Sequence, residues 1–162
     1  TNVNRIFSSR LSYNKGAMVT HMLRWRIGDE DFYQGLRNFL ADPLLAFGYA
    51  VTDDLQMHLE ATSGMDLTEF FEDWVYGQGF PSYISSVGNI GNNQVSVYLE
   101  QTQSHPSVSF FEMPVEIRVY GSGGQVYDFV VEHTTNGQEF IVDVPFTIVD
   151  FDFDPNRHII SN

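Results

Sequence analysis

The hydrophobic positions follow two different periods along the chain. From Ser12 to Val75 they recur at helical spacing, three or four residues apart, and glycine or proline stands at the breaks between runs. After Pro81 they alternate with polar residues, which is typical of half-buried strands. We therefore expect an α+β chain in two parts, with an α-helical part over residues 1–80 and an antiparallel, immunoglobulin-like β-sandwich over residues 81–162.

Four helices are predicted in the first part, and each ends where the sequence carries a stop signal. Their expected ranges are about 13–27, 29–41, 52–64 and 66–77. The first helix has an apolar stripe of Met18, Met22 and Trp25, with Val19 and Leu23 beside it. In the second helix the expected stripe comprises Phe32, Leu36, Phe39 and Leu40.

Two of these helices begin with capping signals. Thr52 is the expected N-cap of the third helix, and acidic residues follow it in the first turn. Asp66 and Glu69 have the spacing of a capping box at the start of the fourth helix. Met65 and Phe70 stand at the positions of a hydrophobic staple there. The fourth helix therefore carries the fullest start signal.

Five strands are expected in the second part, over residues 95–99, 111–119, 127–131, 140–144 and 149–153. Turn residues separate them. The run Gly121-Ser122-Gly123-Gly124 predicts a hairpin, and so does Asn136-Gly137, which is suited to the positive φ angles of a type I′ turn.

The charge balance limits the partners of the chain. It has 21 acidic and 8 basic residues, a net charge of -13, so that nucleic acid and anionic membrane surfaces would repel it. No apolar run approaches the roughly 18 residues of a membrane span. The first residues are not a signal peptide, and we expect the start of the chain to be internal.

Metal sites are not expected within the chain. It has no cysteine, and no two histidines stand four residues apart on a helix, as a zinc-binding pair would. The five histidines are scattered at His21, His58, His105, His133 and His158. Asp150, Asp152 and Asp154 should project from one strand face and could bind calcium, but a solvated face is the preferred interpretation because no calcium-loop motif accompanies them.

An ordered set of motifs resembles the aminopeptidase N family of zinc metallopeptidases. In the helical part they are Tyr13-Asn14-Lys15-Gly16-Ala17, Gly28-Asp29-Glu30-Asp31-Phe32, Thr52-x-x-Leu55, Ser63-Gly64-Met65-Asp66-Leu67 and Phe70-Phe71-x-x-Trp74-Val75. After it come Gly79-Phe80-Pro81, Gln101-x-Gln103 and Phe111-x-Met113-Pro114-Val115. Each motif is weak alone, and their order makes the resemblance specific.

The resemblance implies that the helical part is the end of a thermolysin-like catalytic domain. It also implies that Tyr13 is the catalytic tyrosine whose hydroxyl stabilises the tetrahedral intermediate. The zinc-binding His-Glu-x-x-His helix, the further glutamate ligand and the loop for the substrate amine would precede Thr1. We therefore expect a parent enzyme that binds zinc and hydrolyses N-terminal peptide bonds, and a chain that is inactive alone.

Several alternatives stay open at this stage. A non-catalytic homologue would carry the same segment, and the β-sandwich alone would serve as a binding module for protein or glycan. Phe71 and Trp74 are expected in the core, although a substrate cleft is the competing interpretation. The composition is compatible with an exported bacterial protein, periplasmic or extracellular.

Overall fold

The computed structural model describes residues 6–162, and the chain divides into two compact units between Tyr76 and Gly77. Helices make up the first unit, and antiparallel strands make up the second. The predicted α+β class, helices followed by a β-sandwich, is confirmed.

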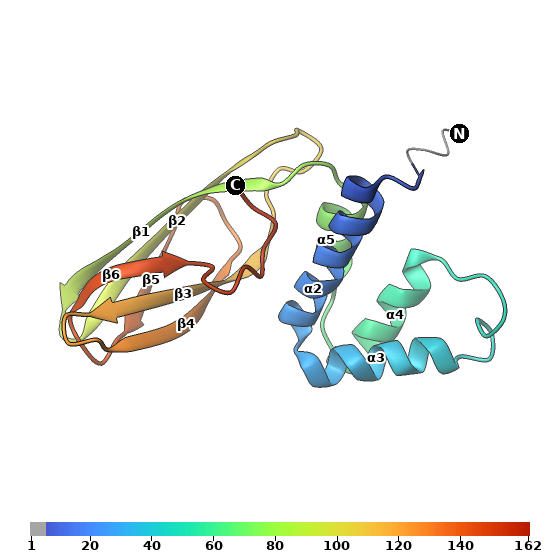
Figure 1. The fold of residues 1–162 in the computed structure, drawn as a ribbon, viewed down its shortest axis with the longest axis horizontal. Helices are drawn as coiled ribbons and strands as arrows, with labels where there is room; N and C mark the ends of the chain where they lie inside the picture. Colours follow the sequence, from blue (N-terminus) through green and yellow to red (C-terminus); the bar gives the residue numbers. More distant parts are fainter. Residues whose placement is uncertain (1–5) are drawn as a thin grey trace. The chain divides into compact units, whose positions relative to one another are not determined.

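The helical unit contains the four expected helical regions (Figure 1). The first and the last of these regions include a π turn. In chain order the elements are η1 (Ser9–Asn14), α2 (Lys15–Ile27), α3 (Asp29–Ala41), α4 (Thr52–Ser63), α5 (Thr68–Phe71) and η2 (Glu72–Tyr76). A π turn contains an extra residue, which widens the helix locally. The spacing of apolar residues does not reveal it.

Glycines end two of the helices, as predicted. Gly28 separates α2 from α3 with a φ of 83°, and Gly64 closes α4 in the left-handed conformation with a φ of 68°. These angles favour glycine because it has no Cβ. Across the first break, the Arg24 guanidinium donates two hydrogen bonds to the Asp29 carboxylate, at 2.7 and 2.8 Å. The positive φ of Gly28 and the ion pair between Arg24 and Asp29 together fix the corner between α2 and α3.

The predicted cap of α4 is wrong by one residue. Val51 is the N-cap and Thr52 is the first helical residue. The Asp54 carboxylate accepts a hydrogen bond from the Val51 N–H at 2.8 Å. An acidic side chain in the first turn therefore satisfies the main chain at this end, and no threonine hydroxyl is needed.

The predicted capping box of the fourth helix is also wrong. The Asp66 carboxylate accepts a hydrogen bond from the Thr68 N–H, only two residues ahead, at 2.9 Å. Helix α5 begins at Thr68, after the buried Leu67. Met65 is 41% exposed and makes no hydrophobic staple. Burial of Leu67 sets the start of this helix, so Asp66 lies outside it in a local turn.

The apolar stripe of α3 is narrower than predicted. Helix α3 packs on α4 at Gly35, where an added Cβ would lie only 2.8 Å from the Leu59 side chain. Phe32 is buried on the same face of α3, whereas Leu40 is 74% exposed. The placement of Leu40 on the packed apolar stripe is therefore wrong, because the contact with α4 is centred on the face that carries Gly35.

The second unit contains six strands in two three-stranded sheets, with strand orders β1-β2-β5 and β4-β3-β6 (Figure 1). They are β1 (Pro81–Gly91), β2 (Gln94–Gln103), β3 (Met113–Gly121), β4 (Val126–His133), β5 (Gln138–Asp143) and β6 (Ile148–Phe153). Strand β1 was not predicted. Its half-buried positions include Ser85 and its exposed positions include Ile84, so its hydrophobic alternation is weak.

The turns of the sandwich only partly follow the prediction. The hairpin at residues 121–124 is confirmed between β3 and β4, where the Gly121 N–H donates to the Gln125 carbonyl at 2.9 Å. Asn136-Gly137, however, closes no hairpin, because β4 pairs with β3 and β5 pairs with β2. The two-residue turn with positive φ at both positions is Asn92-Asn93, between β1 and β2.

A buried glutamine links two segments of the sandwich that carry the family-like motifs. The Gln101 side chain donates to the Phe111 carbonyl at 3.0 Å and accepts from the Phe111 N–H at 2.9 Å. The main-chain N–H of Gln101 donates to the side-chain oxygen of Asn136 at 2.7 Å. Gln101 is 1% exposed, so its hydrogen bonds are shielded from water and their loss would be costly.

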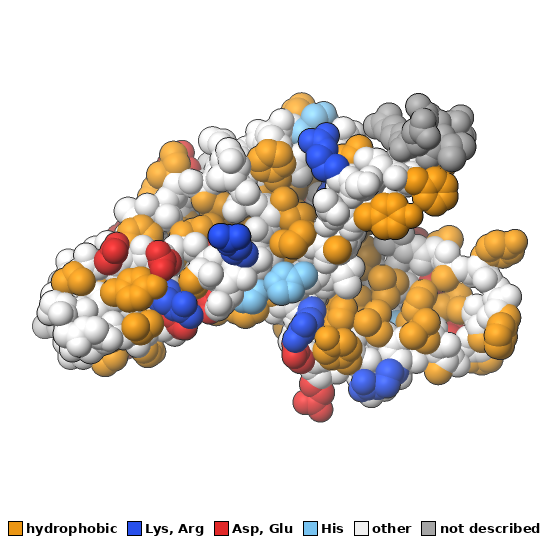
Figure 2. Space-filling model, in the orientation of Figure 1, with side chains coloured by type: hydrophobic (Ala, Val, Ile, Leu, Met, Phe, Trp, Pro, Cys, Tyr) orange, Lys and Arg blue, Asp and Glu red, His pale blue; other side chains and the backbone are white. Residues whose placement is uncertain are grey.

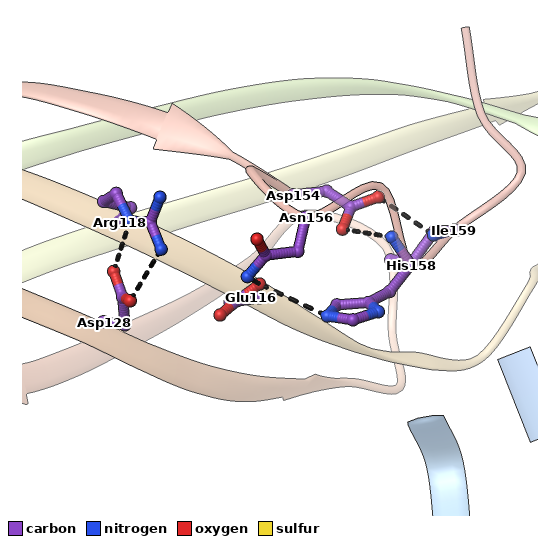
Figure 3. A network of polar contacts seen from close by, with 7 residues as sticks. All are labelled: Glu116, Arg118, Asp128, Asp154, Asn156, His158 and Ile159. Atoms are coloured by element: carbon purple, nitrogen blue, oxygen red, sulfur yellow. Dashed lines mark hydrogen bonds and ion pairs between the residues drawn. The ribbon is translucent and has the colours of Figure 1, made fainter. Parts of the chain in front are cut away.

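The segment after β6 is held by acidic side chains (Figure 3). The Asp154 carboxylate accepts the N–H groups of His158 and Ile159, at 2.7 and 2.9 Å. Glu116 on β3 accepts from the Asn156 side chain at 2.8 Å. These contacts fix the turn that follows β6 against β3.

Asp154 therefore does not share a strand face with Asp150 and Asp152, and the predicted row of three carboxylates is wrong. It lies past the end of β6, with a φ of 45°, and is 7% exposed. Asp150 and Asp152 are exposed on β6 itself. In the sequence, aspartate alternates with apolar residues up to Asp154, but strand β6 already ends at Phe153.

The aromatic core of the helical unit gives a first prediction. Phe71 is 2% exposed and Trp74 is not exposed. Replacing Phe71→Ala should lower the free energy of unfolding of this unit by roughly 3 to 5 kcal/mol. Urea unfolding followed by tryptophan fluorescence reports on this unit, since both tryptophans, Trp25 and Trp74, belong to it.

The matched control is Phe47→Ala, because Phe47 is fully exposed. This replacement should change the same free energy by less than about 0.5 kcal/mol. Equal effects at the two positions would show that Phe71 is not a core residue.

A second prediction concerns the pH dependence of the sandwich. His133 is fully buried, and burial lowers its pKa, although backbone groups of Leu99 and Thr135 partly oppose the shift. The pKa of this histidine in the unfolded chain is about 6.5. Below that pH, the unfolded chain binds a proton at this position more readily than the folded chain does. Stability is thus retained above that pH and lost as the pH falls, by at most about 1.4 kcal/mol per pH unit from this residue.

His133→Phe should remove this part of the pH dependence between about pH 7 and 5. Urea unfolding followed by far-UV circular dichroism at a series of pH values measures it. His105→Phe, at a partly exposed position, is the control. If the slope persists in His133→Phe, another group causes it.

Candidate functional site

Tyr13 lies in the π turn η1, immediately before helix α2. Its side chain is 60% exposed, so the phenol is open to solvent in this chain. The carbonyl of Ser8 accepts hydrogen bonds from the N–H groups of Ser12 and Tyr13, at 2.9 and 3.4 Å. The Tyr13 ring therefore stands on an ordered main chain while its hydroxyl remains accessible.

Helix α2 anchors this turn to the core. Val19, Met22 and Leu23 are buried along α2. Near the start of the helix, the Thr20 hydroxyl donates to the Gly16 carbonyl at 2.8 Å. A mobile tip would place a hydroxyl poorly, whereas a turn continued by a packed helix can hold it in one direction.

A hollow of about 270 Å³ lies beside the turn. It is lined by Leu11, Ser12, Lys15, Gly16, Val19, Thr20, Leu23, Thr52, Leu55, Phe71, Trp74 and Val75. Lys15 is half-buried there, and burial lowers its pKa. Phe71 and Trp74 are core residues, as expected, whose surfaces also form part of the wall of the hollow.

Three of the five histidines, His58, His105 and His158, have separate local partners. The ring of His58 is 3.1 Å from the Asp42 carboxylate, and that of His158 is 3.5 Å from Glu116. The ring of His105 is 2.9 Å from the Ser107 hydroxyl. Over residues 6–162, the structure gathers no group of three or more histidine, aspartate or glutamate side chains that could hold a metal ion.

The structure adds Ser8 to the residues around Tyr13, and the sequence interpretation missed it. The Ser8 hydroxyl accepts a hydrogen bond from the Leu11 N–H at 3.4 Å, as an N-cap does. A serine just ahead of a helical run is a recognised start signal. It was overlooked because the helix was expected to begin only at Tyr13.

No helix in the described part of the chain is both long enough and apolar enough to cross a membrane.

The comparison with known proteins identifies the helical unit. Residues 1–74 match the Peptidase family M1 domain. Aminopeptidase N of Lactococcus lactis is 34% identical over 79 residues, which cover 49% of this chain and 9% of that protein. A probable aminopeptidase 2 of Sulfurisphaera tokodaii is 30% identical over 113 residues, 68% of this chain and 14% of that protein.

Other matches extend into the sandwich. The tricorn protease-interacting factor F2 of Thermoplasma volcanium is 29% identical over 128 residues, 76% of this chain and 15% of that protein. The crystal structure of Legionella pneumophila aminopeptidase A in complex with aspartic acid shares the fold, with a TM-score of 0.80 and 18% identity. The match covers all of this chain and 19% of that one.

The chain corresponds to a small part of each relative. The chain spans between 9% and 15% of the length of the three curated relatives described above. The resemblance to the aminopeptidase N family, based on the ordered motifs, is confirmed. The match over residues 1–74, together with these relatives, supports the interpretation of the chain as a fragment of an M1 aminopeptidase.

Proposed function

We propose that this chain is part of a zinc aminopeptidase that removes N-terminal residues from peptides, and that Tyr13 is its oxyanion donor. The observation that carries the proposal is the placement of Tyr13 within the family-matched segment, with an exposed side chain on a hydrogen-bonded turn. The aminopeptidases among its relatives support peptide as the substrate.

The chemistry of a phenol fits this role. When a peptide carbonyl becomes tetrahedral, its oxygen gains negative charge, and a fixed donor then lowers the energy of the transition state. A phenol hydroxyl is a hydrogen-bond donor and can make this contact to the developing negative charge. Tyr13 would act by donation alone and would transfer no proton.

The described residues do not themselves fit a zinc site. They bring together no cluster of three ligands, and the ring of His58 already pairs with Asp42. Zinc, when bound in the parent enzyme, would supply a Lewis acid for the carbonyl and lower the pKa of a water molecule. Its ligands would come from polypeptide other than the residues described here.

The surface of the helical unit supports a larger parent domain. Hydrophobic side chains gather over this unit (Figure 2). Those that are at least 65% exposed from the end of α3 to the start of α4 are Leu40, Leu44, Phe47, Tyr49 and Val51. Apolar groups that cluster in this way usually contact other protein surfaces. In the proposed parent enzyme, this surface packs on the remainder of the catalytic domain.

The central test of the proposal is Tyr13→Phe in the complete peptidase. The change removes one hydroxyl and retains the ring, so packing should be preserved. Because the donor acts mainly on the charged transition state, kcat should fall by roughly 10²- to 10³-fold while KM changes little. Steady-state kinetics on an aminoacyl chromogenic substrate, with zinc content measured in both proteins, provides the comparison.

Tyr127→Phe is the matched control, because Tyr127 is exposed on strand β4, outside both the turn and the surface that packs on the rest of the catalytic domain. It should leave both constants within about twofold. If Tyr13→Phe keeps kcat within about threefold, Tyr13 is not the oxyanion donor. A parent protein that holds no zinc and hydrolyses no peptide would instead be a non-catalytic homologue.

The proposal also predicts the behaviour of the isolated chain. It should retain no stoichiometric zinc after dialysis and should hydrolyse no aminoacyl substrate, because ligands and a catalytic base are expected elsewhere in the parent. Metal analysis by mass spectrometry checks this directly. One tightly held zinc ion per chain would show that the histidines have been misinterpreted.

A further inference from the structure

The main chain that carries Tyr13 departs from a regular α-helix. Two hydrogen bonds in η1 span five residues, from the Tyr13 N–H to the Ser8 carbonyl and from the Lys15 N–H to the Arg10 carbonyl. An α-helix would form these bonds over four residues. The turn thus contains one residue more than helix α2, which continues it.

One extra residue changes the direction of the side chains that precede it. Successive residues of an α-helix are about 100° apart around its axis, so an insertion rotates the preceding positions by up to that angle. Val19 and Leu23 fix helix α2 in the core, so the helix itself cannot rotate. The side chains of the turn before it must therefore change direction instead. The direction of the Tyr13 side chain depends on whether this turn keeps its π form.

Ser8 is the residue that holds the turn at its start. Its carbonyl accepts the N–H groups of both Ser12 and Tyr13, and its hydroxyl accepts that of Leu11. Three N–H groups at the free end of the turn are thereby satisfied by one residue. Without the hydroxyl, the Leu11 N–H would have to find another acceptor, which favours a rearranged first turn.

We propose that Ser8 is a positioning residue for Tyr13, acting through the π turn at residues 9–14. The inference rests on the proposed function, since it assigns to Ser8 the placement of the same phenol. Ser8 is not expected to touch the substrate. Its contribution is made through the direction of the Tyr13 hydroxyl.

The test uses the complete, zinc-loaded peptidase. Ser8→Ala should lower kcat by about three- to tenfold and leave KM within about twofold, because a modest misplacement weakens a transition-state contact more than substrate binding. Ser9→Ala is the matched control, because Ser9 is exposed on the same turn and should have no effect. Thermal midpoint and zinc content are measured for every variant.

A pair of isosteric variants guards against a folding defect. Ser8→Thr keeps the acceptor and should retain kcat, whereas Ser8→Val has the same shape without it and should behave as Ser8→Ala does. If both lose activity equally, shape rather than the hydroxyl matters, and the inference is overturned.

A double-mutant cycle separates this inference from the proposed function. In the Tyr13→Phe background, Ser8→Ala should cause no further loss, because there is no hydroxyl left to position. Suppose that Tyr13→Phe lowers kcat, and that the fold-loss of the double variant equals the product of the two single fold-losses. Ser8 then acts independently of Tyr13, and the inference fails. If Tyr13→Phe has no effect, the proposed function fails first.

Discussion

Burial of the aromatic pair Phe71 and Trp74 is the constraint on which the helical unit depends. Both side chains are buried almost completely, and both border the hollow whose wall includes Ser12 and Lys15 from the Tyr13 segment. Large aromatic side chains contribute more to a small core than any other residue type. Helix α2 keeps its register because it packs in this core, and the position of the turn before it follows from that register.

The sandwich depends on a different kind of interaction. Its buried aliphatic side chains make no directional contacts. The side chain of Gln101, by contrast, forms hydrogen bonds with both the N–H and the carbonyl of Phe111. A polar pair in a dry interior fixes one arrangement, because any other would leave buried groups without partners. The main chain at Phe111 is thereby fixed against Gln101, which lies ten positions earlier in the chain.

The sequence predicted some of the features that rest on local chemistry, although the capping signals at Thr52 and Asp66 were misassigned. The change of period located helices and strands, and Gly28 and Gly64 located helix ends through their positive φ angles. Features that rest on tertiary packing escaped prediction. Leu40 is exposed because the contact between α3 and α4 centres on Gly35. Asn136-Gly137 has hairpin chemistry, yet β4 and β5 belong to different sheets. The same limit applies to the candidate site: a resemblance named Tyr13, but only the structure shows the π turn that carries it and the hydrogen bonds that Ser8 makes there.

In the proposed mechanism, the Tyr13 hydroxyl donates to the charged oxygen of the tetrahedral intermediate. A crystal structure of the complete peptidase with a phosphinic peptide tests this contact, because the tetrahedral phosphorus imitates that intermediate. We expect the Tyr13 oxygen to lie about 2.6 to 3.2 Å from a phosphinyl oxygen, with η1 still in its π form. A Tyr13 oxygen more than about 4 Å from both phosphinyl oxygens, with another donor in its place, would contradict it.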